Sequence, residues 1–252
     1  RVRNPKFVID EVGYLISNYN VKTIFDDTGT FPIGNWLREF CELMIDKGHN
    51  KRVDFSCNAR FGSLSSDDYV LMKRAGFRML LFGLESANQR TLDKINKRLT
   101  VDEIINSCKK AKEAGLEPHL TIMFGYSWET VEEAKKTFEL GKFLLKKGYA
   151  DTVQATTIIP YPGTDLFNEA ERQGWLKTLD WQRYDMSEPI MMTSVTDEEI
   201  MKIVQSPYKI AFSPEFFIRK IANIRDLDDI KFTLMAAKKV LGHLMDFRAK
   251  RN

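Results

Sequence analysis

Residues 77–86 read FRMLLFGLES, and this stretch predicts the fold class of the chain. Its first six side chains are almost all apolar, which is typical of a strand buried on both faces of a sheet. Gly83 interrupts the apolar run, and the acidic Glu85 and the polar Ser86 follow it. The stretch therefore predicts a buried strand with a polar carboxyl end.

Similar segments lie on both sides of this one, and helix-like segments separate them. The strand-like segments are residues 21–25, 52–57, 77–86, 117–125 and 151–160. The helix-like segments between and before them are residues 6–18, 36–47, 65–74, 100–115 and 129–147. Strands that alternate with helices predict a parallel α/β sheet, which is either doubly wound or curved into a barrel.

The last third of the chain has a different pattern. Helix-like segments at residues 165–173, 197–208, 214–224 and 228–247 follow one another there. We therefore divide the chain into an α/β core, residues 1–165, and a helical C-terminal extension, residues 166–252, packed on it. Between the helices, Trp175, Trp181 and Tyr184 are predicted to form a hydrophobic anchor for the extension.

Composition excludes several classes of protein. The 252 residues are 43% hydrophobic and 29% charged with a net charge of +3, so no electrostatic case for nucleic acid exists. No apolar stretch approaches the roughly 20 residues that span a bilayer. Cys41, Cys57 and Cys108 are far apart and without metal-ligand spacing, which predicts buried, reduced thiols in a cytoplasmic protein.

Polar residues and glycines follow each predicted strand. Carboxylates accept hydrogen bonds from an ammonium group or from ribose hydroxyls. The guanidinium group of Arg60 can bind a carboxylate through two parallel hydrogen bonds. Gly83 and Gly125 allow the backbone to approach a flat ring. The strand ends therefore suit an amino acid joined to a nucleoside.

Each of these features also has a plainer interpretation. Asp26 and Asp27 could form Asx turns, and Arg60 could make a surface ion pair. Glu129 could complement a helix dipole, and Lys97 reads as a solvated helix charge.

Five longer segments carry a resemblance to a known family: IFDDTGTFP, FSCNARFG, GFRMLLFGLESANQRTLDKINK, HLTIMFGYSWET and QATTIIPYPGTDLF. In this order and spacing they resemble radical S-adenosylmethionine enzymes, in particular the branch with an N-terminal cobalamin-binding domain. The resemblance implies a partial TIM-like (β/α)6 barrel that holds a 4Fe–4S cluster and S-adenosylmethionine. It also implies reductive cleavage of that cofactor to a 5′-deoxyadenosyl radical, or cobalamin-assisted methyl transfer.

The resemblance also assigns site residues. Residues after the first predicted strand would contact the methionine amino group of the cofactor. Residues after the second and third strands would contact its methionyl part, its ribose or the substrate. Residues after the fourth strand would contact its adenine. The expected cofactor-binding residues are Asp26, Asp27, Thr28, Asn58, Arg60, Glu85, Ser86, Ile122, Gly125 and Glu129. Gln154 and Thr156 are expected to face a small-molecule substrate. Ser127 replaces the proline that this family usually has in the fourth motif.

One part of the family pattern is missing. The cluster motif C-x-x-x-C-x-x-C does not occur in the chain, so no metal-binding residue is predicted. We expect the first strand, the cluster loop and a cobalamin-binding domain to belong to a longer chain, and this fragment to be inactive alone. Two alternatives stay open: a non-radical barrel enzyme that uses Asp27 and Glu85 as acid and base, or a non-catalytic nucleotide-binding barrel.

Overall fold

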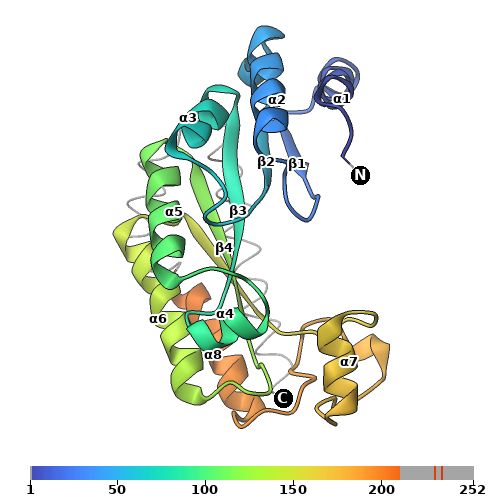
Figure 1. Cartoon of the computed structure of the whole chain (residues 1–252), viewed down its shortest axis with the longest axis vertical. Helices are drawn as coiled ribbons and strands as arrows, with labels where there is room; N and C mark the ends of the chain where they lie inside the picture. The colour runs from blue at the N-terminus through green and yellow to red at the C-terminus, as the bar shows by residue number, and fades with distance from the viewer. Residues whose placement is uncertain (1, 211–229, 231–233, 235–252) are drawn as a thin grey trace. The chain divides into compact units, whose positions relative to one another are not determined.

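The computed structural model describes residues 2–210, 230 and 234 (Figure 1). The chain forms two compact units, which we describe separately. The first contains residues 1–123 and 139–156, and the second contains residues 124–138 and 157–252. The predicted division into residues 1–165 and 166–252 stays a prediction. The predicted helices at residues 214–224 and 228–247 lie outside the described residues.

Among the described residues, five strands form one sheet in the order β1-β2-β3-β4-β5. Their bounds are β1 Thr23–Asp26, β2 Asp54–Ala59, β3 Phe77–Glu85, β4 Glu117–Phe124 and β5 Thr152–Thr157. The pairs β1–β2, β2–β3 and β3–β4 are all parallel. Each strand pairs with the next one in sequence, as in a barrel, whereas a doubly wound sheet reverses its strand order. The sheet therefore has the order of a partial TIM-like barrel.

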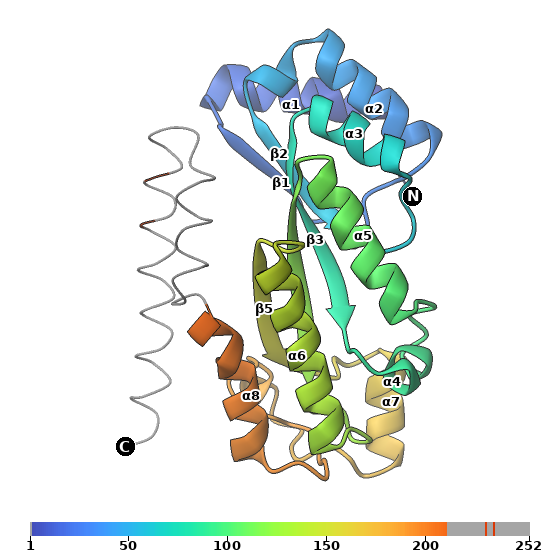
Figure 2. The ribbon, with the colours of Figure 1, turned by 90° about the vertical axis from the view of Figure 1, so that its left-hand side faces the viewer.

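The helices alternate with these strands. They are α1 Pro5–Tyr19, α2 Asn35–Asp46, α3 Ser66–Arg74, α4 Gln89–Lys94, α5 Val101–Glu113, α6 Val131–Lys147, α7 Asp165–Arg172 and α8 Asp197–Ile210. Within the first unit, α1, α2, α3 and α5 follow one another along the same side of the sheet (Figure 2). The six-residue helix α4 was not predicted, because its sequence is too short to show a helical period.

Local sequence fixes where α3 and α5 begin. Ser65 accepts a hydrogen bond from the backbone N–H of Asp68, and the Asp68 carboxylate accepts one from the N–H of Ser65. Thr100 and Glu103 form the same reciprocal pair at α5. Both capping boxes satisfy donors that a helix leaves free at its first turn, so the predicted helix starts are confirmed.

The two faces of the sheet differ in burial. Along β4, Pro118, Leu120, Ile122 and Phe124 are buried, and the residues between them are only partly buried. The prediction of strands buried on both faces is therefore wrong for β4. A curved parallel sheet has one face packed on helices and one face directed into the barrel, where polar side chains find partners.

Four phenylalanine side chains, from the loop after β1, α2, β2 and β3, pack together in the core of the first unit. The rings of Phe31, Phe40, Phe55 and Phe77 all lie edge-on or tilted toward one another, and Phe55 and Phe77 have ring centroids 5.0 Å apart. Such contacts add to the free energy of burying each ring. Phe31 belongs to the loop after β1, so this cluster anchors that loop to the core.

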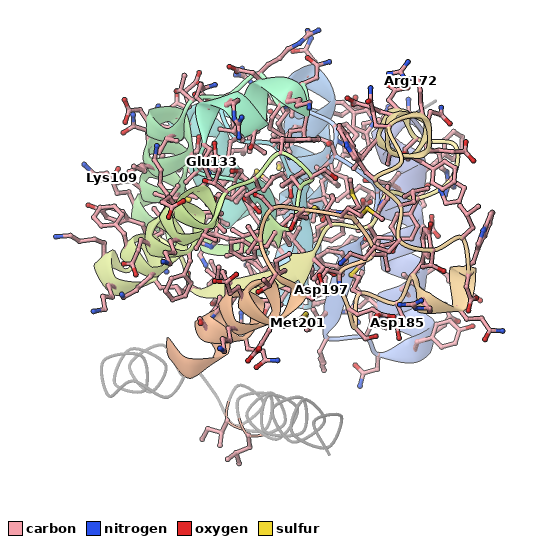
Figure 3. All side chains as sticks on the ribbon, turned by 90° about the horizontal axis from the view of Figure 1, so that it is seen from below. Lys109, Glu133, Arg172, Asp185, Asp197 and Met201 are labelled. Atoms are coloured by element: carbon pink, nitrogen blue, oxygen red, sulfur yellow. The ribbon has the colours of Figure 1, made fainter. Side chains whose placement is uncertain are left out.

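The second unit is built from short elements. An antiparallel bridge joins Leu176 to Met191. Asp197, labelled in Figure 3, lies at the start of α8 and forms an ion pair with Lys177. Tyr184 is buried and donates its hydroxyl to the carbonyl of Thr178 at 3.1 Å. Trp181, in contrast, is 64% exposed, so its predicted place in a hydrophobic anchor is wrong.

Candidate functional site

The loop after β1 begins with an Asx turn. Asp26 Oδ1 accepts a hydrogen bond from the backbone N–H of Thr28 at 3.0 Å and another from the Thr28 hydroxyl. This is the plainer of the two interpretations of Asp26. One oxygen of the Asp26 carboxylate is thus committed to the loop, and its predicted contact with a methionine amino group stays a prediction.

Asp27 is exposed and lies beside the end of β2. The amide nitrogen Nδ2 of Asn58 is 3.4 Å from Asp27 Oδ1 and donates to the Thr28 carbonyl at 2.7 Å. The backbone N–H of Phe31 donates to the Asn58 carbonyl at 2.9 Å. Asn58 therefore ties the β1 loop to β2 and leaves the Asp27 carboxylate accessible at this edge.

Arg60 follows β2 and has a backbone partner. Its Nη2 donates to the carbonyl of Lys97 at 2.7 Å, and no carboxylate contact of Arg60 occurs within the described residues. The surface ion pair considered for Arg60 is therefore absent there. The guanidinium holds the segment after α4 against the end of β2.

Glu85, at the end of β3, forms an ion pair that the sequence did not predict. Its Oε1 accepts from Lys97 Nζ at 2.8 Å, and the two side chains are 14% and 24% exposed, respectively. The interpretation of Lys97 as a solvated charge is wrong. The other carboxylate oxygen, Oε2, is buried and has no hydrogen-bond partner among the residues that the structure describes.

Gly83 provides the space for this ion pair. A Cβ atom at Gly83 would lie 2.3 Å from Glu85 Oε1 and 2.8 Å from Lys97 Nζ, closer than real Cβ contacts occur. We predicted that Gly83 lets the backbone approach a flat ring. In the structure the vacant side is filled by the ion pair instead.

Ser86 is fully buried. Its Oγ accepts hydrogen bonds from both the backbone N–H and the side-chain amide of Asn88, each at 3.2 Å. These bonds hold the turn between β3 and α4. The predicted cofactor contact of Ser86 stays a prediction, with its hydroxyl engaged in the turn.

In the second unit, Glu129 closes the loop after β4. Its Oε2 accepts from the backbone N–H of Gly125 at 2.9 Å, and the N–H of Tyr126 also donates to the carboxylate. The side chain is fully buried and Oε1 has no hydrogen-bond partner within the described residues. Burial raises the pKa of Glu129 to about 7, because an ionised carboxylate loses its hydration there.

Glu129 precedes α6 rather than lying in its first turn. The acidic residues of that turn are Glu132 and Glu133, and Glu133 accepts from the backbone N–H of Thr130 at 2.9 Å. The helix-dipole interpretation of Glu129 is therefore wrong. Gly125 has a φ of +90°, a left-handed conformation that favours glycine, so the loop needs both residues.

The remaining predicted residues lie along the strands. Ile122 is fully buried on the face of β4 that packs on α6, with its Cδ1 near Gly141. The predicted cofactor contact of Ile122 stays a prediction. On β5, Gln154 is exposed and Thr156 is half-buried, and their predicted substrate contacts stay predictions.

The three cysteines are free and fully buried. Burial raises the pKa of Cys41 and of Cys108 to about 12 and that of Cys57 well above its ordinary value, so none is a ready thiolate. Their interpretation as packing residues is confirmed. Residues 2–210 with 230 and 234 contain no group of three metal-ligating side chains, and none of their helices is long and apolar enough to cross a membrane.

A comparison with protein families matches this architecture. A sequence model described as the radical SAM superfamily matches residues 1–141, more than half of the chain. The chain belongs to the radical SAM superfamily. The family uses S-adenosylmethionine together with a 4Fe–4S cluster, and the relatives that match this chain include enzymes named as methyltransferases and cyclases.

Curated relatives of this radical SAM chain are longer than it is. It is 30% identical over 223 residues to an uncharacterized methyltransferase of Pyrococcus horikoshii, covering 87% of this chain and 46% of the relative. It is 28% identical over 225 residues to an anaerobic magnesium-protoporphyrin IX monomethyl ester cyclase of Cereibacter sphaeroides, covering 87% and 35%. The chain thus spans less than half the length of these two relatives.

Solved structures share the radical SAM fold. The methyltransferase TsrM from Kitasatospora setae, solved with cobalamin and an iron–sulfur cluster, has a TM-score of 0.60 at 15% identity, covering 79% of this chain and 40% of TsrM. The cobalamin-dependent radical enzyme OxsB has a TM-score of 0.57 at 12% identity, covering 99% and 42%. At this identity the likeness shows the fold, which agrees with the partial barrel described above.

Proposed function

We propose that the full-length protein is a cobalamin-dependent radical SAM enzyme and that this chain binds S-adenosylmethionine at the carboxyl ends of β1, β2 and β3. The observation that carries the proposal is the carboxylate of Glu85, whose buried Oε2 has no donor within the described residues. A buried acceptor without a donor costs about 1–3 kcal/mol or more when the group is charged, so a ligand donor would stabilise it.

The residues present fit S-adenosylmethionine by their chemistry. The ligand carries an ammonium group and two ribose hydroxyls, and Glu85 and the accessible Asp27 are acceptors for such donors. When bound, the sulfonium of this cofactor supplies either a 5′-deoxyadenosyl radical or a methyl group. The chain's own residues bind and orient it, since Asn58 fixes the loop that carries Asp27.

The residues do not fit a 4Fe–4S cluster. Such a cluster needs several cysteine thiolates close together, and Cys41, Cys57 and Cys108 are each buried and unpaired. We propose that the cluster ligands are supplied by another part of the full-length protein. We assign no step of the reaction to residues of this chain through that cluster.

Cobalamin use is supported by the names of the similar proteins. OxsB is named a cobalamin-dependent S-adenosylmethionine radical enzyme, and TsrM is a radical S-adenosylmethionine methyltransferase solved with cobalamin bound. The Pyrococcus relative is named a methyltransferase. We propose that a cobalamin-binding domain lies in the same full-length chain and that a small molecule is the substrate. We also propose that the protein works in the cytoplasm.

The test is anaerobic reconstitution of the full-length protein with iron and sulfide, with and without cobalamin. After reduction with S-adenosylmethionine present, we expect either 5′-deoxyadenosine or S-adenosylhomocysteine, both measured by liquid chromatography. Glu85→Gln is expected to reduce the product, and Glu113→Gln, a matched change of an exposed carboxylate on α5, is the control. Absence of both products and of any cluster absorbance would contradict the proposal.

The alternatives give different results. A non-radical enzyme that uses Asp27 and Glu85 as acid and base would keep its activity in air with a chelator present. A non-catalytic barrel would bind the nucleotide part and form no product. No contact within the described residues joins Asp27 to Glu85, so the structure does not favour the acid–base alternative.

A further inference from the structure

We propose that Lys97 is a positioning residue that orients the Glu85 carboxylate for a ligand donor. The inference rests on the proposed function, because it concerns the same ligand. Lys97 Nζ binds Glu85 Oε1 at 2.8 Å, and Oε2 is left as the acceptor without a partner in the described part of the chain. Lys97 therefore selects which oxygen receives the hydroxyl or ammonium of S-adenosylmethionine.

The backbone around Lys97 is held in an uncommon conformation. Asn96 and Arg98, its two neighbours, have φ values of 54° and 52°, a left-handed region that residues other than glycine adopt at a cost. The N–H of Lys97 donates to the carbonyl of Leu92, a buried residue of α4, at 2.8 Å. A conformation of this cost persists only where surrounding contacts fix it.

Arg60 supplies one of those contacts. Its Nη2 donates to the carbonyl of Lys97 at 2.7 Å, so the residue that follows β2 is joined to the segment after α4. The side chain of Lys97 is thereby directed to the end of β3, which lies next to β2 in the sheet. Arg60 thus acts on the ligand through Lys97, and its predicted contact with a carboxylate stays a prediction.

The end of β3 is shaped to receive the lysine. The register of β3 on β4 shifts between Gly83 and Glu85, which is the signature of a β-bulge, and Glu85 has a φ of 61°. A bulge redirects the side chain that follows it. The carboxylate therefore returns over Gly83, the position where a Cβ atom would collide with both members of the ion pair.

A purely structural ion pair is the competing explanation, and a double-mutant cycle separates the two. The dissociation constant of S-adenosylmethionine is measured for the full-length, reconstituted protein and for Lys97→Met, Glu85→Gln and the double variant. If Lys97 acts through Glu85, each single change should weaken the binding of S-adenosylmethionine about tenfold, because each costs the ligand one hydrogen bond to a charged group. The double variant then binds no more weakly than Glu85→Gln.

Lys109→Met, an exposed lysine of α5, is the matched control and is expected to bind like the wild type. Gly83→Ala, which displaces the same ion pair by steric overlap, is expected to match Lys97→Met and keeps the test informative if that variant folds poorly. Methionine and 5′-methylthioadenosine serve as separate probes. The probe whose affinity falls in Lys97→Met identifies the donor as the ammonium or the ribose hydroxyl.

Three results would overturn the inference. They are a Lys97→Met affinity within twofold of the wild type, losses that add fully in the double variant, and equal losses for both probes. Failure of the wild type to bind S-adenosylmethionine would instead overturn the proposed function, and the inference with it. The first three outcomes leave the proposed function intact.

Discussion

Two glutamates at or after the ends of neighbouring strands are held in different ways. Glu85, the last residue of β3 in the first unit, accepts a hydrogen bond from a lysine side chain that comes from the segment after α4. Within the described part of the chain, Glu129, after β4 in the second unit, accepts only from backbone N–H groups of its own loop. Each has one carboxylate oxygen without a partner among the described residues.

The different hydrogen-bond donors give the two carboxylates different abilities to bind a ligand. A side-chain cation beside Glu85 compensates its charge while leaving one oxygen for a ligand. Glu129 has no cation bound to its carboxylate in the described structure and is fully buried, so burial favours its neutral form. Its carboxyl group accepts the backbone N–H groups of its loop and so fixes that loop. We therefore propose that the donors around a strand-end carboxylate decide whether it binds a ligand, as at Glu85, or fixes its own loop, as at Glu129.

Removal of the Glu129 side chain is expected to have the largest effect. Glu129→Ala leaves the N–H groups of Gly125 and Tyr126 without their acceptor and opens a cavity, which should lower the free energy of unfolding by about 4 kcal/mol. Urea denaturation measures this change. Glu132→Ala, an exposed change in the first turn of α6, is the control and should alter stability by less than about 0.5 kcal/mol.

The pH dependence of stability should sharpen the contrast. Because the pKa of Glu129 is about 7 in the folded state against 4.5 as its ordinary value, the folded state binds more protons between these pH values. Stability therefore falls as pH rises from about 4.5 to 7, by about 3 kcal/mol from this group.

Glu129→Gln cannot ionise, so the difference in unfolding free energy between wild type and variant should follow that curve. Urea denaturation of both proteins at several pH values between 5 and 8 measures this difference. Parallel curves for the two proteins would show that the carboxyl is already ionised at pH 5.

The ion pair of Glu85 should matter less for stability than for binding. Both of its side chains keep some exposure, so Lys97→Met is expected to lower the free energy of unfolding by only about 1–2 kcal/mol. Thermal denaturation of the ligand-free protein checks this value. A loss as large as that of Glu129→Ala would mean that the two carboxylates have the same structural role.

The smallest expected effect concerns the outer support of the Glu129 loop. Ser194 Oγ donates to the carbonyl of Glu129 at 2.9 Å. Ser194→Ala removes one hydrogen bond at a partly exposed site, which should cost about 0.5–1 kcal/mol. Thr193, whose hydroxyl donates to the carbonyl of Val195, offers the comparison variant Thr193→Ser, which retains that donor and should leave stability unchanged within error.

Sequence patterns predicted the local structure well. Each predicted strand of the core is present, and the capping residues Ser65 and Thr100 begin their helices as expected. The resemblance also indicated the family, which the match over residues 1–141 confirms. Of the site, it indicated which strand ends carry the polar residues, such as Asp27, Asn58 and Glu85.

The partners of those residues were not predictable. The sequence predicts a solvated charge at Lys97, because it does not show that Arg98 adopts a positive φ value or that the lysine turns toward the end of β3. Gly83 was interpreted as space for a ring, and only the return of Glu85 over it shows what fills the space. Glu129 was placed inside a helix that begins two residues later.

The amino-acid sequence by itself determined the strands, the helix starts and the family of this protein. These depend on side-chain periodicity and on hydrogen bonds between residues three or four positions apart, which the sequence shows directly. Only the tertiary structure decided which oxygen of Glu85 is engaged and which backbone groups Glu129 binds. Those choices depend on backbone turns and on contacts between strand ends distant in sequence, and their free energies arise only when the chain is folded.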